Sequence, residues 1–469
     1  MSAASAASAT ESMLADALPT HARIVLKALE ARGFEAWVVG GWVRDTLLGR
    51  PGHDVDVTTS ATWTEAEAAL VSAGIEVHET GTAHGTVTAV VDGLPVEVTT
   101  YREESGYSDL RHPDRVRFVS DVRADLARRD FTVNAIAFHP DRGLLDPYGG
   151  QDDLEARVIR AVGDPEKRLS EDALRVIRAV RFACQLGATI EPATQAVLTE
   201  HAQSLSCIAS ERIGQEMSAL LNTGRVSWAL RKEFDVLVGA IPELECMRDF
   251  DQRSPYHAYD LREHTARVCD GVEEFTGGAA SLTLRWAALL HDIAKPACLS
   301  VDDTGRGHFF DHPAQGARMA KTIMRRLAVR GEVARGACVL IQLHDLSVSA
   351  NASSVRKMLA ALDKGSPGHA PELAFDLLNL QRADATGKAT SCRDYAVKLD
   401  KVTLELRREL VRGAVYRVSD LAVSGKDVVE LRGVEPGPGV GMLLEQLLVA
   451  VVEDELPNDR ETLLEQLRW

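Results

Sequence analysis

The sequence predicts an α+β protein, with a small mixed-sheet head followed by all-helical domains. Short apolar stretches typical of buried strands lie in the first third of the chain, as at Ala36–Val39 and in the alternating run Pro95–Thr100. From Ser170 onward, apolar residues recur at helical spacing instead. The length of 469 residues exceeds what one hydrophobic core usually organises, so we expect three or four domains.

The composition is that of a globular protein, with 45% hydrophobic and 26% charged residues. No apolar run reaches the length that crosses a bilayer, and the opening MSAASAASAT lacks the basic start and apolar core of a secretory signal. The seven cysteines form no CxxC pair, and their odd number argues against a complete disulfide framework. We therefore predict a cytoplasmic protein without a membrane partner, and disorder at residues 1–18.

A net charge of −16 is unfavourable for binding nucleic acid, but the basic residues are unevenly placed. Two neighbouring segments contain the following cluster: Arg102, Arg111, Arg115, Arg117, Arg123, Arg128 and Arg129, then Arg160, Lys167, Arg168, Arg175, Arg178 and Arg181. Such residues form either a local basic channel or surface ion pairs with nearby acids. For any single residue the ion pair is the better expectation.

The stretch GGWVRDTLLGRPGHDVDV, which starts at Gly40, has the features of a metal-dependent phosphate site. Gly40 and Gly41 let the backbone approach a ligand closely before a helix begins, and Arg44 would face the phosphates. If Asp54 and Asp56 lie on a strand, both carboxylates share one face and converge on a hard cation such as Mg²⁺. Either motif alone is commonly a plain turn or strand end, so the context decides.

A third carboxylate, Glu97, belongs to the strand-like run Pro95–Thr100. We expect this strand beside the one that carries Asp54 and Asp56, because two-metal nucleotidyl transfer needs carboxylates that bridge the ions. On pattern alone, an ordinary exposed glutamate is an equally good interpretation. Arg128 and Arg129, in ARRDFTVNAIAF, precede a β-rich stretch and would present planar forks to phosphate oxygens at the same site.

A helix that we expect to begin with Ser170 as its N-cap has a row of charged side chains on one face. The row consists of Asp172, Arg175, Arg178 and Arg181. An aspartate beside an arginine presents an acceptor and a donor together, which would pair with cytosine or adenine but not with guanine or uracil. An intrahelical ion pair on a wet surface is the alternative, which geometry alone favours roughly twofold.

Taken together, these motifs resemble class II tRNA nucleotidyltransferases, which add CCA to tRNA 3′ ends. The resemblance rests on GGWVRDTLLGR with DVDV, RRDFTVNA, DPYGG, EDALRVIRAVRFA and SERIGQEMSALL, in that order. It implies tRNA, CTP and ATP as partners, Mg²⁺ as cofactor and two-metal chemistry with release of pyrophosphate. It also implies that protein side chains, rather than a template, select the base.

Carried over residue by residue, the resemblance implies that Asp54 and Asp56 hold the metals. Asp172 and Arg175 would read the base, assisted by Arg178 and Arg181. The predicted site comprises the catalytic residues Asp54, Asp56 and Glu97 and the nucleotide-binding residues Gly40, Gly41, Arg44, Arg128, Arg129, Asp172, Arg175, Arg178 and Arg181.

Two alternatives from the same superfamily remain open. Bacterial poly(A) polymerases share most of these motifs, but the run ETGTAHGTV at 79–87 resembles a Gly-x-x-Phe/His-Gly-Thr-Val strand of CCA-adding enzymes. Enzymes that add only CC or only A would look nearly identical, and the loop at 102–118 is where we expect them to differ.

The second half resembles the HD phosphohydrolase domain. An apolar helix ends in His291 and Asp292, and the remaining residues of the predicted metal set are His264, His312, His344 and Asp384. Imidazole with carboxylate suits Mn²⁺, Ni²⁺ or Fe²⁺ as well as Mg²⁺. No acidic residue directly follows His312, which departs from the pattern expected at a second metal. An active centre would hydrolyse phosphomonoesters or 2′,3′-cyclic phosphates, and an inert one would serve as a helical arm for tRNA.

We therefore expect a disordered N-terminus at 1–18, a nucleotidyltransferase head at 19–150, a helical neck at 151–250, an HD-like helical domain at 251–400 and a helical tail at 401–469. In the tail, Ser424 would cap a helix, and a turn-rich linker at 433–439 precedes another apolar helix. An HD phosphohydrolase with a nucleotide-sensing head is the alternative from another enzyme class. An RNA-binding module without catalysis is disfavoured by the intact carboxylates. The sequence does not predict the oligomeric state.

Overall fold

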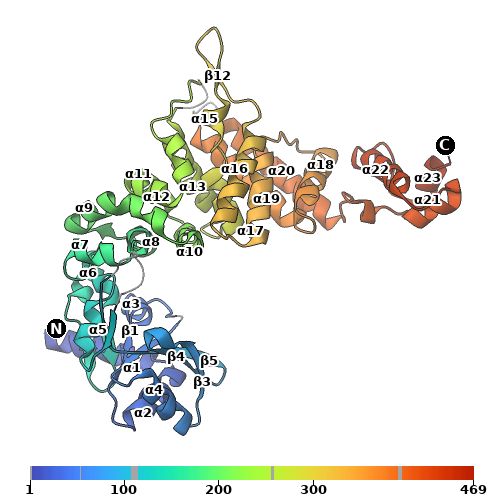
Figure 1. The fold of residues 1–469 in the computed structure, drawn as a ribbon. Helices are drawn as coiled ribbons and strands as arrows, with labels where there is room; N and C mark the ends of the chain where they lie inside the picture. The colour runs from blue at the N-terminus through green and yellow to red at the C-terminus, as the bar shows by residue number, and fades with distance from the viewer. Residues whose placement is uncertain (1–2, 53, 107–114, 255–257, 389–392, 469) are drawn as a thin grey trace. The chain divides into compact units, whose positions relative to one another are not determined.

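The computed structural model describes residues 3–52, 54–106, 115–254, 258–388 and 393–468. The chain divides into two compact units, 1–209 and 210–469, which are described separately (Figure 1). Within the described ranges, no helix combines the length and the apolar character needed to cross a membrane.

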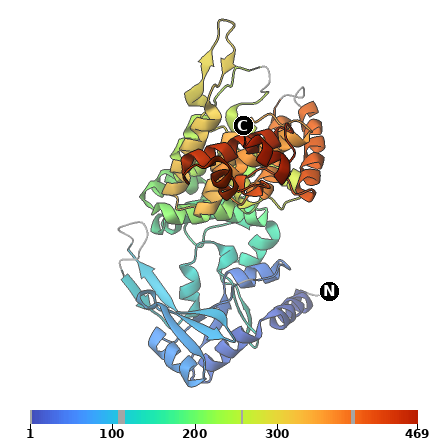
Figure 2. The same ribbon diagram turned by 90° about the vertical axis from the view of Figure 1, so that its right-hand side faces the viewer.

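The first unit is built on a seven-stranded mixed sheet with strand order β3-β4-β5-β2-β1-β8-β9. Its strands are β1 (Ala36–Val39), β2 (Asp56–Thr59), β3 (Glu76–Gly81), β4 (Thr86–Val91), β5 (Leu94–Thr100), β8 (Ala137–His139) and β9 (Gly143–Leu145). Strands β2 and β5 are parallel, whereas every other neighbouring pair is antiparallel. The predicted mixed-sheet head is confirmed (Figure 2).

Helices cover this sheet because their apolar residues fall on one side. Helix α2 (Thr20–Glu30) buries Val25, Leu26 and Leu29 and packs, together with α4 (Trp63–Ser72), against the strands. A capping box between Thr62 and Glu65 starts α4. The unit's other helices are α1 (Ala3–Ala17), α3 (Gly41–Leu47), α5 (Val122–Ala127), α6 (Gly150–Ala156), α7 (Pro165–Glu171), α8 (Leu174–Leu186) and α9 (Pro192–His201), with 3₁₀ turns at Thr82–His84, Thr132–Asn134 and Ala202–Cys207.

Three expectations for this unit need correction. Residues 1–18, for which we expected disorder, contain α1, and Leu14 and Leu18 are buried. Ser170 lies inside α7 and caps nothing; the next helix, α8, begins after Asp172, whose Oδ1 accepts a hydrogen bond from the Leu174 amide at 3.0 Å. The 79–87 run is not one strand, because a 3₁₀ turn separates β3 from β4.

Two small ribbons complete the first unit. Strands β10 (Val158–Ile159) and β11 (Thr189–Ile190) are parallel, so the expected all-helical neck contains a short β-ribbon. The 102–118 segment, expected as a loop, forms the antiparallel pair β6 (Arg102–Ser105) and β7 (Arg115–Phe118). Residues 107–114, including Arg111, lie outside the described residues.

The second unit is helical, as predicted. Its elements are α10 (Ser210–Leu221), α11 (Val226–Lys232), α12 (Phe234–Ala240), a 3₁₀ turn at Pro242–Met247, α13 (Leu261–Thr276), α14 (Leu282–Leu290), α15 (Lys295–Cys298), α16 (His312–Arg326), α17 (Gly331–Leu343), α18 (Ala352–Gly365), α19 (Ala370–Gly387), α20 (Arg393–Val411), a 3₁₀ turn at Val418–Asp420, α21 (Gly425–Arg432), α22 (Pro438–Val452) and α23 (Arg460–Gln466). A short hairpin, β12 (Ser300–Val301) with β13 (Gly307–His308), interrupts them.

Helices α13, α14, α17 and α19 pack on one another around the fully buried Trp286. The C-terminal helices form their own apolar cluster, which includes Val428, Leu444 and Leu463. Ser424 and Asp427 form the expected cap of α21. The division between the two units falls inside the predicted neck at 151–250, and the boundaries of the five predicted domains remain predictions.

Candidate functional site

The first unit contains a cavity of about 510 Å³ lined mainly by residues that the sequence singled out. Its lining comprises Gly40, Gly41, Trp42, Arg44, Asp45, Asp54, Asp56, Arg129, Asp130, Asn134, Arg178, Arg181, Phe182 and Gln185. Segments far apart in the chain meet here: the turn after β1, the start of β2, the segment after α5 and the C-terminal half of α8. The twin aspartates and the arginine-bearing helix therefore enclose one pocket.

The carboxylates come together because β2 and β5 are parallel neighbours. Asp56 opens β2, with Asp54 two residues earlier, and Val55 between them is buried as the alternation predicts. Glu97 on β5 pairs in register with Asp56. Burial raises the pKa of Asp56 to about 6; Arg129 opposes this rise, and the charges of Glu97 and Asp54 add to it. A site in which acids destabilise one another's charge fits a divalent cation.

Position 40 requires glycine, because its backbone is left-handed and two side chains approach it closely. Its φ of 74° is in the left-handed region, and a Cβ atom there would lie 3.0 Å from Nη1 of Arg129 and 3.8 Å from Oδ2 of Asp56. Gly41 follows as the first residue of α3. The GG turn thus lets the backbone line the cavity, as predicted.

A chain of polar contacts runs from α3 to α8 along the cavity. Arg44 donates from Nη1 to Oδ1 of Asn134 at 2.7 Å, and Asn134 donates to Asp130 at 3.0 Å. Arg178 donates to Oδ2 of Asp130 from both Nε and Nη2, at 3.0 and 2.6 Å. Burial would raise the pKa of Asp130, but Arg178 and Asn134 hold it far below the ordinary value. Arg44 and Arg178 are therefore tied to the same carboxylate network.

The two arginines of the RRD segment have different surroundings. Arg129 lines the cavity, whereas Arg128 is not among the lining residues. The Arg128 guanidinium lies 2.8 Å from Oδ1 of buried Asp125 and 3.4 Å from Glu104. Of the two arginines that we expected to bind phosphate, Arg129 therefore lies at the cavity and Arg128 does not.

The predicted base-reading pair also lies outside the lining. Asp172 caps α8 through Leu174. Arg175 donates from Nη1 to Glu171 at 2.7 Å and from Nη2 to the carbonyl oxygen of Arg128 at 3.0 Å. Of the charged row that we expected along this helix, Arg178 and Arg181 reach the cavity.

The basic cluster is largely neutralised by ion pairs, which was the expected alternative to a channel. These pairs are Arg102 with Glu104, Arg117 with Glu103, Arg128 with Asp125, Arg160 with Asp153, Arg168 and Arg175 with Glu171, and Arg178 with Asp130. For these described residues the ion-pair interpretation therefore holds.

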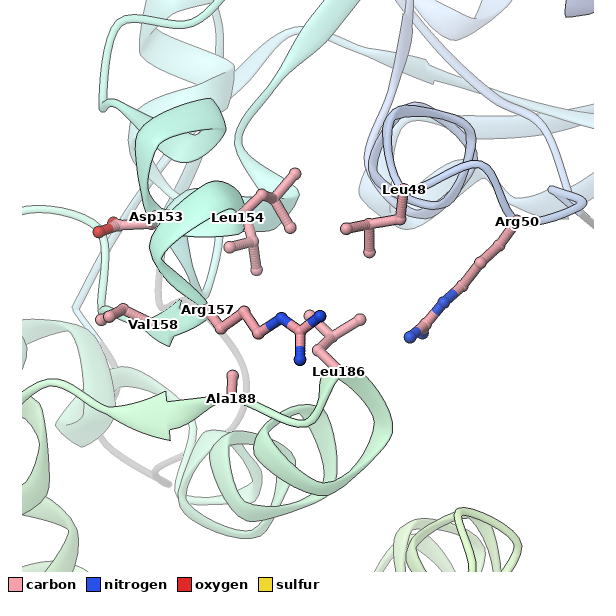
Figure 3. A pocket seen from close by; sticks show the side chains of 9 residues that line it. Leu48, Arg50, Asp153, Leu154, Arg157, Val158, Leu186 and Ala188 are labelled. Atoms are coloured by element: carbon pink, nitrogen blue, oxygen red, sulfur yellow. The ribbon is translucent and has the colours of Figure 1, made fainter. Parts of the chain in front are cut away.

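A smaller cavity of about 120 Å³ is lined by none of the predicted site residues (Figure 3). Leu48, Leu154 and Leu186 give it apolar walls, and the side chains of Arg50 and Arg157 extend along it. Arg50 also donates to the carbonyl oxygen of Gln185, at 3.1 Å. Its size and apolar walls do not suit a nucleotide, so we take the larger cavity as the candidate active site.

The second unit has a buried cluster formed by all six residues of the predicted HD set. His264, His291, Asp292 and Asp384 form one group of potential metal ligands, and Asp292, His312 and His344 form another. Asp292 belongs to both: its Oδ2 lies 3.1 Å from His291 and 3.3 Å from His264, and its Oδ1 lies 3.3 Å from His312 and 3.6 Å from His344.

Each histidine is oriented through its other ring nitrogen. The Nδ1 atoms of His264, His291, His312 and His344 lie 2.7 to 3.2 Å from the carbonyl oxygens of Gly387, Ala288, Phe309 and Ile341. This leaves every Nε2 directed at the carboxylates, the arrangement that metal-binding histidines adopt.

The donor set fits a pair of divalent metal ions. Both oxygens of Asp292, and Oδ1 of Asp384, are buried without a hydrogen-bond donor, apart from the nearby imidazoles and Lys295. Burial would raise the pKa of Asp292, but His291 and Lys295 hold it well below the ordinary value, so it is charged and able to bridge. The acidic residue missing after His312 does not remove the second group, because Asp292 supplies its carboxylate and Asp345 lies 3.5 Å from His312.

Sequence reasoning missed several contributors. Asp130, Asn134 and Gln185 line the first cavity, and Lys295 contacts Asp292 in the second unit. Asp130 and Asn134 lie within the RRDFTVNA motif, so the motif itself was the available signal. Phe182 also lines the cavity, and its apolar character at helical spacing is equally typical of a core residue.

Comparison with known proteins connects both sites to described families. The poly A polymerase head domain model matches residues 36–160, and a model of the RNA- and SrmB-binding site of polymerase A matches 187–247. The HD domain model matches 256–364, and a model of the second domain of tRNA nucleotidyltransferases matches 393–467.

Full-length relatives share one description. The CCA-adding enzyme of Latilactobacillus sakei is 34% identical over 96% of both chains, and that of Levilactobacillus brevis is 32% identical over 94% of this chain and 96% of the relative. The Bacillus stearothermophilus CCA-adding enzyme in complex with CTP superposes with a TM-score of 0.71 at 29% identity, covering 95% and 96% of the two chains. The Thermotoga maritima enzyme complexed with tRNA shares the fold, with a TM-score of 0.59 at 18% identity over 97% of both chains.

Proposed function

The chain belongs to the family of CCA-adding enzymes, and from this we propose that it adds CCA, without a template, to the 3′ end of tRNA. CTP and ATP would be the substrates and pyrophosphate the second product. The observation that supports this most directly is the shared cavity, in which the aspartates of β2 and the arginines of α8 meet. The proposed tRNA substrate also supports the predicted cytoplasmic location.

In this proposal Asp54 and Asp56 hold the divalent metal ions, for which we propose Mg²⁺. Oxygen donors suit Mg²⁺, and the raised pKa of Asp56 reflects a pocket that favours an added cation. When bound, the ions would acidify the attacking hydroxyl and stabilise negative charge on the leaving group. Glu97, in register with Asp56, adds a third carboxylate beside that place.

The arginines would bind and orient the triphosphate. Arg44 and Arg129 line the same cavity as the aspartates, and planar guanidinium groups bond two phosphate oxygens at once. The 3′ oxygen of the tRNA would form a bond to the α-phosphorus while the bond from that phosphorus to the β-bridging oxygen breaks. The pyrophosphate that leaves would remain beside these two cations.

A basic groove in the second unit supports tRNA as a partner. A cavity of about 560 Å³ is lined mainly by residues of α16 and α17, and its lining includes the cations Arg318, Lys321, Arg325 and Arg335 beside apolar side chains. Lys321, Arg325 and Arg335 have no ion-pair partner among the described residues. Unpaired cations in a chain of net charge −16 are what a phosphodiester backbone would neutralise.

One assay tests the proposed transfer. Purified protein is given tRNA transcripts that end before the first C, after the first C and after the second C, with labelled CTP, ATP, UTP or GTP supplied alone. We expect C, C and A to be added in turn, with no incorporation of UTP or GTP. Repeated addition of A would indicate a poly(A) polymerase, and addition at only some ends would indicate a CC- or A-adding enzyme.

We propose a metal-dependent phosphohydrolase activity as a second function, supported by the bridging position of Asp292 between the two ligand groups. When bound, a pair of ions such as Mn²⁺, Ni²⁺ or Fe²⁺ would activate a water molecule for attack on a phosphoester. The chain's own part is to orient four imidazoles and to exclude bulk water. Hydrolysis of 2′,3′-cyclic AMP that depends on added metal, and that Asp292→Asn abolishes, is the expected result; an inactive metal-loaded protein would assign the domain a supporting role.

A further inference from the structure

The ring of Phe182 lies among three arginines of the candidate active site. Phe182 is on α8, is 4% exposed and lines the cavity. The Cζ atoms of Arg44, Arg178 and Arg181 lie 5.1, 5.2 and 4.0 Å from its ring centroid. One of these arginines comes from α3 and two from α8, so the ring joins two elements that are more than 120 residues apart in sequence.

Three guanidinium groups this close to one point repel one another. Arg44 bonds Asp45 and Asn134, Arg178 bonds Asp130, and Arg181 bonds Oε1 of Gln185 at 3.1 Å. All three also lie close to the same ring, whose negative face attracts cations within about 6 Å of its centroid. An aliphatic side chain of similar size would fill the space without this attraction.

Phe182 is itself held by packing. The ring of Phe131 meets it edge-on, with centroids 5.8 Å apart and an angle of 75° between the ring planes. Phe131 is fully buried and is not among the residues that line the cavity. Phe182 therefore carries the printed contacts with the arginines, whereas Phe131 packs against the edge of its ring.

We propose that Phe182 is the positioning residue that holds Arg44, Arg178 and Arg181 together for the triphosphate of the incoming nucleotide. This proposal rests on the proposed nucleotidyl transfer and deepens it. The resemblance implied that Arg44 contacts the triphosphate and that Arg178 and Arg181 assist base choice. The common ring instead groups all three as one phosphate-binding set, so disturbing the ring affects CTP and ATP alike.

The test compares Phe182→Leu with the matched variant Phe131→Leu, which removes a neighbouring buried ring that lines no part of the cavity. For each we would measure KM for CTP and for ATP, KM for tRNA, the melting temperature, and the dissociation constant of inorganic tripolyphosphate by calorimetry. For Phe182→Leu we expect both nucleotide KM values and the tripolyphosphate constant to rise by the same factor, about tenfold, with KM for tRNA unchanged. Phe182→Tyr keeps the ring face and should restore affinity.

Equal losses in Phe131→Leu would overturn the proposal, because packing alone would then explain them. A change in the ratio of CTP to ATP use without a change in tripolyphosphate binding would also overturn it, in favour of base reading. If Phe182→Leu fails to fold, Phe182→Met gives the same comparison. Tripolyphosphate binding is measured without tRNA, so a wild-type protein that binds it but transfers no nucleotide would refute the proposed function and not this inference.

Discussion

Asp56 and Glu97 are register partners on the parallel strands β2 and β5. The pairing brings the charge of Glu97 close enough to raise the pKa of Asp56, to which Asp54 adds. A parallel pair needs a long crossover, which here consists of α4, β3 and β4. Residues 41 positions apart thus lie side by side, with Asp56 lining the cavity and Glu97 beside it on the next strand, outside the lining.

Substitution of the twin aspartates should remove catalysis without unfolding the head. Asp54 is exposed at the cavity, so Asp54→Ala leaves no buried partner unsatisfied. We expect incorporation of labelled CTP and ATP into truncated tRNA to fall by about a thousandfold or more. A melting temperature within a few degrees of wild type would show that the fold is intact, and retained activity would refute the metal assignment.

Metal affinity of the head should depend on pH through Asp56. Because its pKa is raised from 3.8 to about 6 in the metal-free protein, protons compete with the cation below that value. We expect Mg²⁺ affinity, measured by calorimetry, to fall about tenfold per pH unit below pH 6 and to level off above pH 7. An affinity that stays flat from pH 5 to 7 would contradict this.

The raised pKa of Asp56 also determines how the stability of the folded state changes with pH. A carboxyl group whose folded pKa is raised favours the folded state below 3.8, and this contribution is lost as the pH rises through about 6. Stabilisation by added Mg²⁺ should therefore be largest above pH 6. Melting curves with and without Mg²⁺ at pH 5 and pH 7.5 check this, with Asp56→Asn as the variant in which the pH dependence disappears.

The base-reading role of Asp172 and Arg175 remains a prediction. Arg175 now bonds Glu171 and the Arg128 carbonyl oxygen, so reading a base would require it to leave these partners. We expect Arg175→Ala to weaken discrimination against UTP and GTP by about tenfold or more. The control is Arg160→Ala, which removes an ion-paired arginine from the same unit. Unchanged discrimination would count against the role.

The number of metal ions bound by variants of the HD centre should show which ligand the two groups share. Asp292→Ala removes a ligand from both groups, whereas His312→Ala affects only one. After loading with Mn²⁺, we expect two ions per chain in wild type, one in His312→Ala and none in Asp292→Ala, measured by atomic absorption. His308→Ala, a nearby histidine outside both groups, should keep two. Equal losses in the two ligand variants would contradict the bridging arrangement.

Charge reversal in the basic groove should weaken tRNA binding. The double variant Lys321→Glu/Arg335→Glu reverses the charge of two residues that line the groove. We expect its KM for tRNA to rise about tenfold and its KM for CTP to stay unchanged. Lys321→Ala should reduce the salt slope of tRNA binding by about one unit. Lys401→Glu, an exposed cation on α20 outside this groove, is the control. An equal effect of the control would indicate unspecific electrostatics.

Local pattern predicted much of the fold and the acidic part of the site. The run Ala36–Val39 is a strand with the expected bounds, and Val55 is buried between two acids as alternation requires. The start of α8 could not be predicted in this way, since Asp172 caps it while Pro165 begins a separate helix before it. A side chain that bonds the backbone can end one helix and start another within a stretch of continuous helical spacing. The sequence does not show at which residue this happens.

Long-range partners were beyond sequence reasoning. Arg178 bonds Asp130 across 48 positions, and no helical spacing indicates this. Similarly, the six HD ligands were predicted by their types and order, but the bridging of two groups by Asp292 depends on how α13, α14, α16, α17 and α19 pack. Phe182 fits an apolar stripe, and its contact with three arginines appears only when α3 is placed beside it.

The number of residues in helix α8 determines where its cavity-lining side chains lie. Arg178, Arg181 and Phe182 follow the capped start at Leu174 without interruption, and Gln185 near the end is held by Arg50. One extra residue near Val176 would turn everything downstream by about 100° and shift it by roughly 1.5 Å. The four α8 side chains that line the cavity would then leave it together, although none had been replaced. Insertions and deletions in this helix should accordingly be far more damaging than most single substitutions.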